Sequence, residues 1–314
     1  MAFFEENRAS DISMADVIES LYGFFPDIEE DDVHFFYHGT YNVFEVKDRY
    51  IFRIPDKVFR NQKGVKLIQN ELKMLNHIRK HVSVTIPDIL YLSLDPDCPL
   101  MGYEKIEGIP LSQCFHKTPQ LAKFQIAQEI GRFLSELHSN ELLHEAMRSR
   151  VIDTSDFYKQ YRSYWENYNN KIQSSIVETM KSTQKNWITN LFNAFLNEKE
   201  NFNFKYAIIH GDFDISNILV NPEHFKVTGI VDFEEARIYD PAADFLFFDE
   251  GDDFLQEILS NYRGDIDANF KNRMKFFYGR SCLGYIEFGL EHNLPDLVNA
   301  GFQLLAIRMK KFPI

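Results

Sequence analysis

Three residues whose side-chain oxygen atoms can bind a metal lie near one another along the chain, each close to an apolar run. Asp212 and Asn217 stand at the two ends of a short polar loop that follows the apolar run 206–209. A second apolar run, 218–220, follows this loop, and Asp232 directly follows a third, 227–231. Carboxylate and amide oxygens are ligands that Mg²⁺ prefers, and a carboxylate can also accept the proton of a hydroxyl. The pattern therefore favours a metal ion held beside a carboxylate that can act as a base.

Taken singly, each piece has a plainer explanation, because Asp-x-x-x-x-Asn is common in turns and Asp-Phe at strand ends. Their order between apolar runs resembles the catalytic loop and metal-binding turn of the kinase fold. The resemblance implies that Asp212 accepts the proton of the acceptor hydroxyl. It also implies that Asn217 and Asp232 bind Mg²⁺.

The elements expected before this loop match the small lobe of kinases. Helical spacing after Ser13 predicts a short capped helix, and spacing over 61–81 predicts a longer one. Alternating apolar runs between turn signals predict five strands, at 33–37, 41–46, 50–54, 89–94 and 100–106. We therefore predict an α+β, two-lobed protein-kinase-like fold, with a small antiparallel-sheet N-lobe at 1–107 and a larger, mostly helical C-lobe at 108–314.

The C-lobe is predicted to be helical outside the catalytic loop. Helices are expected at 120–139, 249–262, 266–291 and 295–310. Residues 152–201 form two further helical stretches rich in tyrosine and tryptophan. This insertion is interpreted either as a flap that faces the substrate or as an ordinary helical hairpin with an aromatic seam.

Kinases place a cation on the third strand and a glutamate on the next helix, and the two hold the donor phosphates. The matching residues here are Arg53 and Glu71. Lysine is usual at the first position, and arginine is not its equivalent, although it can bind phosphate through two bonds. Lys57 and Arg60 are nearby substitutes. The plainer alternative is a surface ion pair between Arg53 and Glu71.

Two further segments are expected on the nucleotide side. The turn between the first two strands carries Gly39, Thr40 and Asn42, whose backbone N–H groups could bind phosphate, although the multi-glycine motif of many nucleotide sites is absent. The extended backbone at Met101 and Tyr103 could pair with the edge of a purine base. A strand followed by a Gly-Pro turn is the simpler interpretation of that segment.

The chain also resembles the aminoglycoside phosphotransferase family, and within it the enzymes that phosphorylate the 2″-hydroxyl. The stretches that carry this resemblance are 50–55, 70–75, 101–111, 133–138, 210–219, 229–236 and 240–245. They span nearly the whole chain, from about residue 33 to 290. The resemblance implies Mg²⁺ and transfer of the γ-phosphoryl group of ATP or GTP to a hydroxyl of a small, cationic molecule.

Carboxylates are the groups expected to bind the ammonium groups of such an acceptor. Two of the candidates, Asp214 and Glu234, are departures from the family pattern, in which small residues are frequent. The full set of predicted acceptor-binding residues is Asp214, Glu234, Glu235, Asp249, Glu250, Asp252, Asp253 and Tyr285. The acidic run at 249–253 is explained equally well as a solvated helix start, where negative charge is favourable.

Other functions remain open at this point. The same loop would serve a kinase of another small alcohol, such as a macrolide, choline, homoserine or an amino-sugar, because the acceptor pocket decides the substrate. A non-catalytic nucleotide-binding relative is a further alternative, supported by Arg53 and Glu234. A protein kinase is disfavoured because the chain has no Ala-Pro-Glu segment.

Composition narrows the partners and the compartment. The net charge of −13 disfavours nucleic acid and anionic membranes as partners. The three cysteines are widely spaced, which predicts a reducing compartment and no disulfide framework. No signal peptide or spanning run of about 18 apolar residues is evident. A cytoplasmic protein is therefore expected, and its oligomeric state is left open.

Overall fold

The computed structural model describes residues 8–149, 157–176 and 180–313. The chain divides into two compact units. The first contains Met1–Leu137, His210–Arg237 and Glu257–Asn261, and the second contains His138–Ile209, Ile238–Gln256 and Tyr262–Ile314. The predicted lobe boundary after residue 107 stays a prediction, and residues 152–156 and 177–179 of the predicted insertion lie outside the described residues.

A five-stranded antiparallel sheet forms the core of the first unit. Its strands are β1 (Val33–His38), β2 (Tyr41–Val46), β3 (Tyr50–Pro55), β4 (Ile89–Ser93) and β5 (Leu100–Glu104). They lie in the order β1-β2-β3-β5-β4, so β5 is an inner strand between β3 and β4. The five predicted strands are confirmed, although the last ends at Glu104 and not at residue 106.

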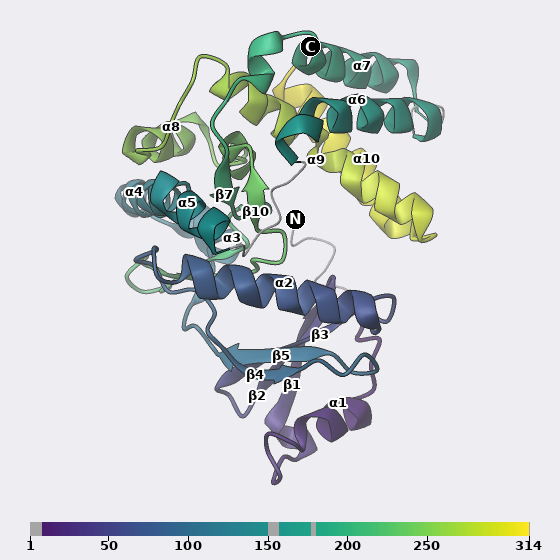
Figure 1. The fold of residues 1–314 in the computed structure, drawn as a ribbon, viewed down its shortest axis with the longest axis vertical. Helices are drawn as coiled ribbons and strands as arrows, with labels where there is room; N and C mark the ends of the chain where they lie inside the picture. Colours follow the sequence, from purple (N-terminus) through teal and green to yellow (C-terminus); the bar gives the residue numbers. More distant parts are fainter. Residues whose placement is uncertain (1–7, 150–156, 177–179, 314) are drawn as a thin grey trace. The chain divides into compact units, whose positions relative to one another are not determined.

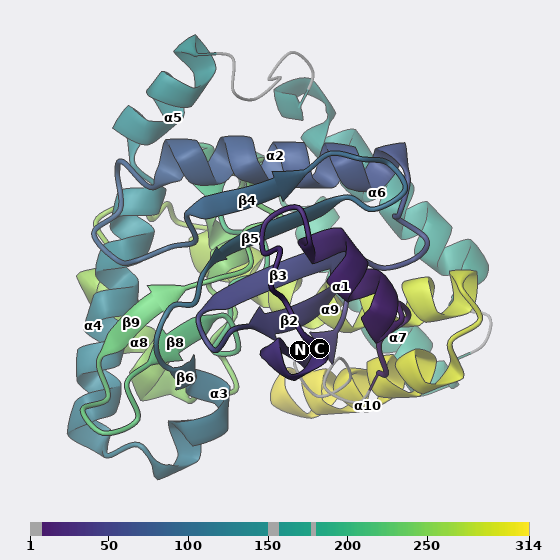
Figure 2. The same ribbon diagram turned by 90° about the horizontal axis from the view of Figure 1, so that it is seen from below.

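Two helices cover opposite faces of this sheet (Figures 1 and 2). On one face, α1 (Met14–Leu21) buries Val17 and Leu21 against a cluster that includes Phe44 and Phe52. On the other, α2 (Gln62–Ile78) places Ile68 among Tyr41, Val43, Ile51, Met101 and Tyr103. The strand side chains alternate between the two clusters because successive residues of a strand point to opposite faces.

Local signals in the sequence set the ends of these elements. Ser13 caps α1 by accepting a hydrogen bond from Asp16 N–H, and Asn61 caps α2 by accepting one from Lys63 N–H. The β2–β3 turn places Lys47 and Asp48 at positive φ. The apolar residues of α2 recur at helical spacing, so they form one face, and Ile68 on that face packs against Ile51 of β3.

The remaining elements of the first unit carry the polar loop. They are β6 (Ile109–Pro110), α3 (Leu111–Cys114), the 3-10 turn Phe115–Lys117, α4 (Gln120–Leu137), β8 (Ile218–Val220) and β9 (Val227–Ile230). The three short strands form a second antiparallel sheet in the order β6-β8-β9 (Figure 2). Phe213 in the loop packs against Phe133 of α4, with ring centroids 5.4 Å apart.

The second unit is mainly helical. Its helices are α5 (Asn140–Arg148), α6 (Phe157–Ser175), α7 (Ser182–Leu196), the first half of α8 (Asp252–Asn261), α9 (Phe270–Glu291) and α10 (Pro295–Lys311), with 3-10 turns at Lys199–Phe202 and Pro241–Asp244. Strands β7 (Ala207–Ile209) and β10 (Arg237–Tyr239) pair with each other. Helix α6 lies beside α7, and α9 lies beside α10 (Figure 1).

Aromatic side chains fill the space between α6, α7 and α9. Trp165 of α6 is fully buried, and its ring centroid lies 4.9 Å from that of Phe276 in α9. Phe276 in turn stacks on Phe195 of α7 at 3.7 Å. Within the described part of 152–201, these rings form the aromatic seam of a helical hairpin. None of the helices in the described residues is both long and apolar enough to cross a membrane.

Candidate active site

A hairpin brings two of the predicted metal ligands together. Strands β8 and β9 pair with Ile218 opposite Ile230, and the N–H of Val231 donates to the carbonyl of Asn217 at 3.0 Å. Asp232 follows directly, at a φ of 70° that β-strand residues do not adopt. The backbone thus turns sharply at Asp232, next to Asn217.

The amide of Asn217 is held in one orientation. Its Nδ2 donates to the backbone carbonyl of Asp212 at 2.8 Å, which directs the side-chain oxygen away from that bond. The hydrogen bond also closes the loop, because it joins the residues predicted as base and metal ligand. An amide oxygen and a carboxylate on adjacent residues of a hairpin are a donor set that suits Mg²⁺.

The start of the loop is fixed by His210 and Gly211. Nε2 of His210 donates to the carbonyl of Val231 at 2.9 Å, and its ring packs against Phe233 at 4.5 Å. Gly211 has a φ of 92°, and a Cβ there would lie 2.4 Å from the carbonyl oxygen of Glu235. Only glycine fits both conditions. The half-buried Asp212 is therefore presented from a rigid turn.

Arg53 joins β3, α2 and the turn at Asp232. Its Nη1 donates to Glu71 at 2.5 Å, and its Nη2 donates to Asp232 at 2.7 Å and to Glu234 at 3.3 Å. The guanidinium carbon also lies 4.1 Å from the ring centroid of Tyr41. The side chain of Arg53 is only 4% exposed. The Arg53–Glu71 pair is thus a buried interaction, not the surface ion pair considered above.

The charges around Arg53 shift its neighbours' proton affinities. Burial alone would lower the pKa of Arg53, but Glu71 and Asp232 outweigh it and hold that pKa well above its ordinary value. Burial raises the pKa of Glu71 to about 7 although Arg53 opposes the shift, and burial together with Asp232 raises that of Glu234 well above its ordinary value. One guanidinium therefore does not fully compensate three carboxylates.

This arrangement can position a phosphate and a cation. A buried arginine on the third strand, a helix glutamate that orients it, and two oxygen ligands on a hairpin are the parts that phosphoryl transfer requires. A family-wide sequence comparison matches residues 32–267 to the phosphotransferase enzyme family. The chain belongs to this family. It is therefore a small-molecule phosphotransferase that acts on an alcohol group, and the family predicted from the motifs is confirmed.

Solved structures of similar fold cover nearly the whole chain. The GDP complex of aminoglycoside 2'-phosphotransferase-IIIa is 23% identical, with a TM-score of 0.82 over 96% of this chain and 100% of that one. An APH(2″) structure with GDP and kanamycin is 22% identical, with a TM-score of 0.80 over 94% and 98%. Macrolide 2'-phosphotransferase MphH from Brachybacterium faecium is 17% identical, with a TM-score of 0.71 over 92% and 98%. These likenesses confirm the predicted kinase-like α+β fold.

The predicted phosphate turn of the phosphotransferase is constrained by its own contacts. Gly39 N–H donates to the carbonyl of Tyr41 at 2.9 Å, so this N–H is used within the turn. The Asn42 side chain is fully buried and bonds Asp11 and the carbonyl of Ile54. Thr40, by contrast, is only half-buried, and its side chain favours the charged form of the Glu234 carboxylate. That these residues bind nucleotide stays a prediction.

Met101 and Tyr103 are placed differently from the sequence-based expectation. Both belong to β5, an inner strand whose backbone faces β3 on one edge and β4 on the other. Both residues thus have a paired strand on each side, and that they contact a purine base stays a prediction. The connection between lobes was expected to begin at Met101, but β5 continues to Glu104 and the N–H of Lys105 still donates to the carbonyl of Arg49 at 2.7 Å. Both side chains are buried in the cluster under α2.

The acidic residues of the first unit have partners near the loop. Asp214 accepts hydrogen bonds from the N–H of Ser216 at 2.7 Å and from its hydroxyl at 2.5 Å, an arrangement that stabilises the turn. Glu235 is exposed and pairs with Arg237 at 2.7 Å. Glu234 binds Arg53, so its contacts lie on the predicted nucleotide side. Their roles toward an acceptor stay predictions.

The other predicted acceptor residues belong to the second unit. Asp249 accepts hydrogen bonds from Tyr278 and from Arg308, the latter at 2.5 Å, so its charge is balanced within that unit. Asp252 and Asp253 are exposed in the first turn of α8. The remaining two, Glu250 and Tyr285, are both partly exposed.

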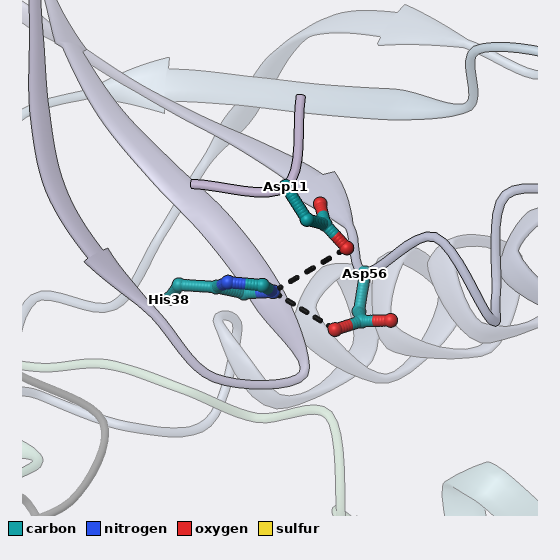
Figure 3. Close-up of side chains that lie close together, drawn as sticks. All are labelled: Asp11, His38 and Asp56. Carbon is teal, nitrogen blue, oxygen red and sulfur yellow. Dashed lines mark hydrogen bonds and ion pairs between the residues drawn. The ribbon is translucent and has the colours of Figure 1, made fainter. Parts of the chain in front are cut away.

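Sequence reasoning missed a cluster at the N-terminal end of the described chain. His38, at the end of β1, has Nε2 2.9 Å from Asp56 and 3.7 Å from Asp11 (Figure 3). Arg8 pairs with Asp56 at 2.9 Å, and Arg60 pairs with Asp11 at 3.1 Å. Two guanidinium groups already balance the two carboxylates, which disfavours a divalent cation. We interpret these five residues as an ion-paired N-terminal clip; no local motif could have revealed it.

Proposed function

We propose that this phosphotransferase transfers the γ-phosphoryl group of ATP or GTP to a hydroxyl of an aminoglycoside. The observation that supports this most is the shared guanidinium of Arg53, which connects Glu71 with Asp232 in a buried setting. A phosphate-binding role explains why the chain maintains this buried arginine despite the desolvation of its charge.

Each residue of the site has a role in this reaction. Asp212 accepts the proton of the acceptor hydroxyl as the oxygen attacks the γ-phosphorus. Arg53 binds the donor phosphates, with Glu71 fixing its position. Asn217 and Asp232 would hold Mg²⁺, which when bound supplies positive charge that stabilises the transferring phosphoryl group. The carboxylates thus remove the proton and position the cation, while no covalent intermediate on the chain is needed.

The acceptor is assigned from charge and from relatives. An acidic chain with exposed carboxylates at Asp252 and Asp253 suits a polycation. One relative of the same fold has been solved with kanamycin and GDP bound, and others act on macrolides. Arg308 already pairs with Asp249, which weakens the attraction of that carboxylate for an ammonium group. A macrolide kinase is therefore the second candidate. We place the activity in the cytoplasm, where nucleoside triphosphates are available and the three free cysteines stay reduced.

A coupled assay of nucleoside diphosphate release tests this proposal. The purified chain is offered ATP or GTP with Mg²⁺ and, in turn, kanamycin, gentamicin, erythromycin, choline and glucosamine. Turnover with an aminoglycoside that disappears in Asp212→Asn supports the proposal. Turnover with erythromycin alone would reassign the acceptor, and nucleotide binding without transfer to any alcohol would contradict the proposal.

A further inference from the structure

The site around Arg53 carries more negative charge than the family pattern requires. Glu71, Asp232 and Glu234 all bond to the same guanidinium. Among the described residues, no other cation is paired with any of these three carboxylates. One buried guanidinium thus faces three carboxylates.

The backbone turn directs Asp232 and Glu234 toward one atom. Phe233 between them is fully buried against His210 and anchors the turn, and Ala236 N–H donates to its carbonyl at 3.0 Å. The carboxylates on either side of Phe233 consequently both accept hydrogen bonds from Nη2 of Arg53. The carboxylate of Glu71 accepts a hydrogen bond from Nη1 of the same guanidinium. The terminal nitrogens that would bind phosphate are therefore occupied by carboxylates.

Glu234 also reaches the turn between β1 and β2. The side chain of Thr40, in the segment predicted to contact the phosphates, favours the charged form of the Glu234 carboxylate. Its side chain is 19% exposed, compared with 22% for Asp232 and 4% for Arg53. Glu234 is thus accessible to a ligand that approaches Asp232, and it lies on the nucleotide side of the loop.

We propose that Glu234 is a positioning residue that makes nucleotide binding strongly dependent on a divalent cation. Without the cation, Asp232 and Glu234 compete with phosphate for Nη2 of Arg53. A cation beside Asp232 attracts both carboxylates and thereby frees the guanidinium for phosphate. Since each ligand favours the arrangement that the other needs, metal and nucleotide binding are positively coupled. This inference rests on the proposed nucleotide site.

Binding measurements on Glu234→Gln test the proposal without relying on turnover. The dissociation constants of GDP and ADP are measured by calorimetry, once with Mg²⁺ in excess and once with EDTA. In the wild type, Mg²⁺ tightens binding by a large factor. In Glu234→Gln we expect this factor to fall about tenfold, within the range common for coupled sites. The control is Glu235→Gln, which removes an exposed neighbouring carboxylate that pairs with Arg237.

The outcomes separate this inference from the proposed function. An equal effect of Mg²⁺ in the wild type and in Glu234→Gln would overturn the role of Glu234 while leaving the nucleotide site intact. So would an equally large fall of the factor in Glu235→Gln. If the wild type binds neither nucleotide under any condition, the proposed function fails and this inference with it. Should Glu234→Gln not fold, Glu234→Ala gives the same comparison.

Discussion

The carboxylate of Asp212 accepts the proton in the proposed reaction, so its loss should affect chemistry and spare binding. Asp212→Asn keeps the backbone carbonyl that accepts the hydrogen bond from Asn217. We expect kcat to fall by about 10²–10⁴-fold, the usual contribution of a general base. The nucleotide dissociation constant and the melting temperature should stay at wild-type values. Steady-state kinetics and calorimetry check both, and an unchanged kcat would remove Asp212 as the base.

Arg53 is expected to matter for stability as well as for binding, because it compensates buried carboxylates. Arg53→Met leaves Glu71, which is 1% exposed, without its cation. Breaking a buried pair in this way costs about 3–5 kcal/mol of unfolding free energy. The double variant Arg53→Met/Glu71→Gln should recover part of the loss. Urea unfolding of the wild type, both single variants and the double variant measures the coupling, and equal stability of Arg53→Met and the double variant would show that Glu71 is not the partner.

At the scale of the elements, the catalytic loop depends on one glycine. Gly211→Ala introduces a Cβ at 2.4 Å from the carbonyl of Glu235 and at a φ of 92°. We expect a loss of about 1–3 kcal/mol of stability together with a large loss of activity, because Asp212 is displaced. Gly251→Ala is a matched control, since Gly251 also has positive φ, at 106°, but open space around it. Equal unfolding free energies for the two variants would contradict the close approach.

The N-terminal clip predicts that the sheet becomes less stable in acid. Burial would raise the pKa of Asp56, but hydrogen bonds from His38, the Val58 amide and Arg8 outweigh it and hold the pKa well below its ordinary value. A depressed carboxylate pKa stabilises the fold fully above the unfolded value, about 3.9, and this contribution is lost as the pH falls below it. Asp56→Asn should therefore be less stable than the wild type by about 1–3 kcal/mol at neutral pH.

Chemical unfolding between pH 3 and pH 6 checks this sign. The stability difference between the wild type and Asp56→Asn should shrink as the pH falls toward 3. Asp48→Asn serves as the control, because the Asp48 side chain is 90% exposed in the turn after β2. A difference that stays constant over this range, or that also appears in Asp48→Asn, would show that the clip is not held by the ionised carboxylate.

What the sequence could predict depends on how far apart the interacting residues are. The strands, α2 and the loop from Asp212 to Asn217 follow from apolar spacing and caps within a few residues, and the structure places them as expected. The bond of Arg53 to Glu234 joins residues 181 positions apart, and no local pattern encodes it. The same holds for Asp249 and Arg308, which are separated by 59 positions.

Strand order was a second limit on prediction. The strand β5, which carries Met101 and Tyr103, lies between β3 and β4, and the sequence does not show this order. Alternating apolar residues predict that a strand has a buried face, but they do not indicate which strands flank it. Whether the backbone groups of a strand are free depends on how the whole sheet is paired, and this pairing cannot be inferred from one strand alone.

At the scale of the whole molecule, the net charge of −13 should attract a cationic acceptor. The exposed acidic residues should determine where on the surface this acceptor binds. Asp252→Asn/Asp253→Asn should raise KM for an aminoglycoside about fivefold at low salt, since exposed charge pairs contribute about 0.2–1 kcal/mol each. The difference should shrink as ionic strength rises, and KM for the nucleotide should not change. Asp249→Asn is the control, because Arg308 already balances that charge and its loss should change KM less. If the two aspartates only stabilise the first turn of α8, the melting temperature of the double variant will fall while KM for the aminoglycoside stays at the wild-type value.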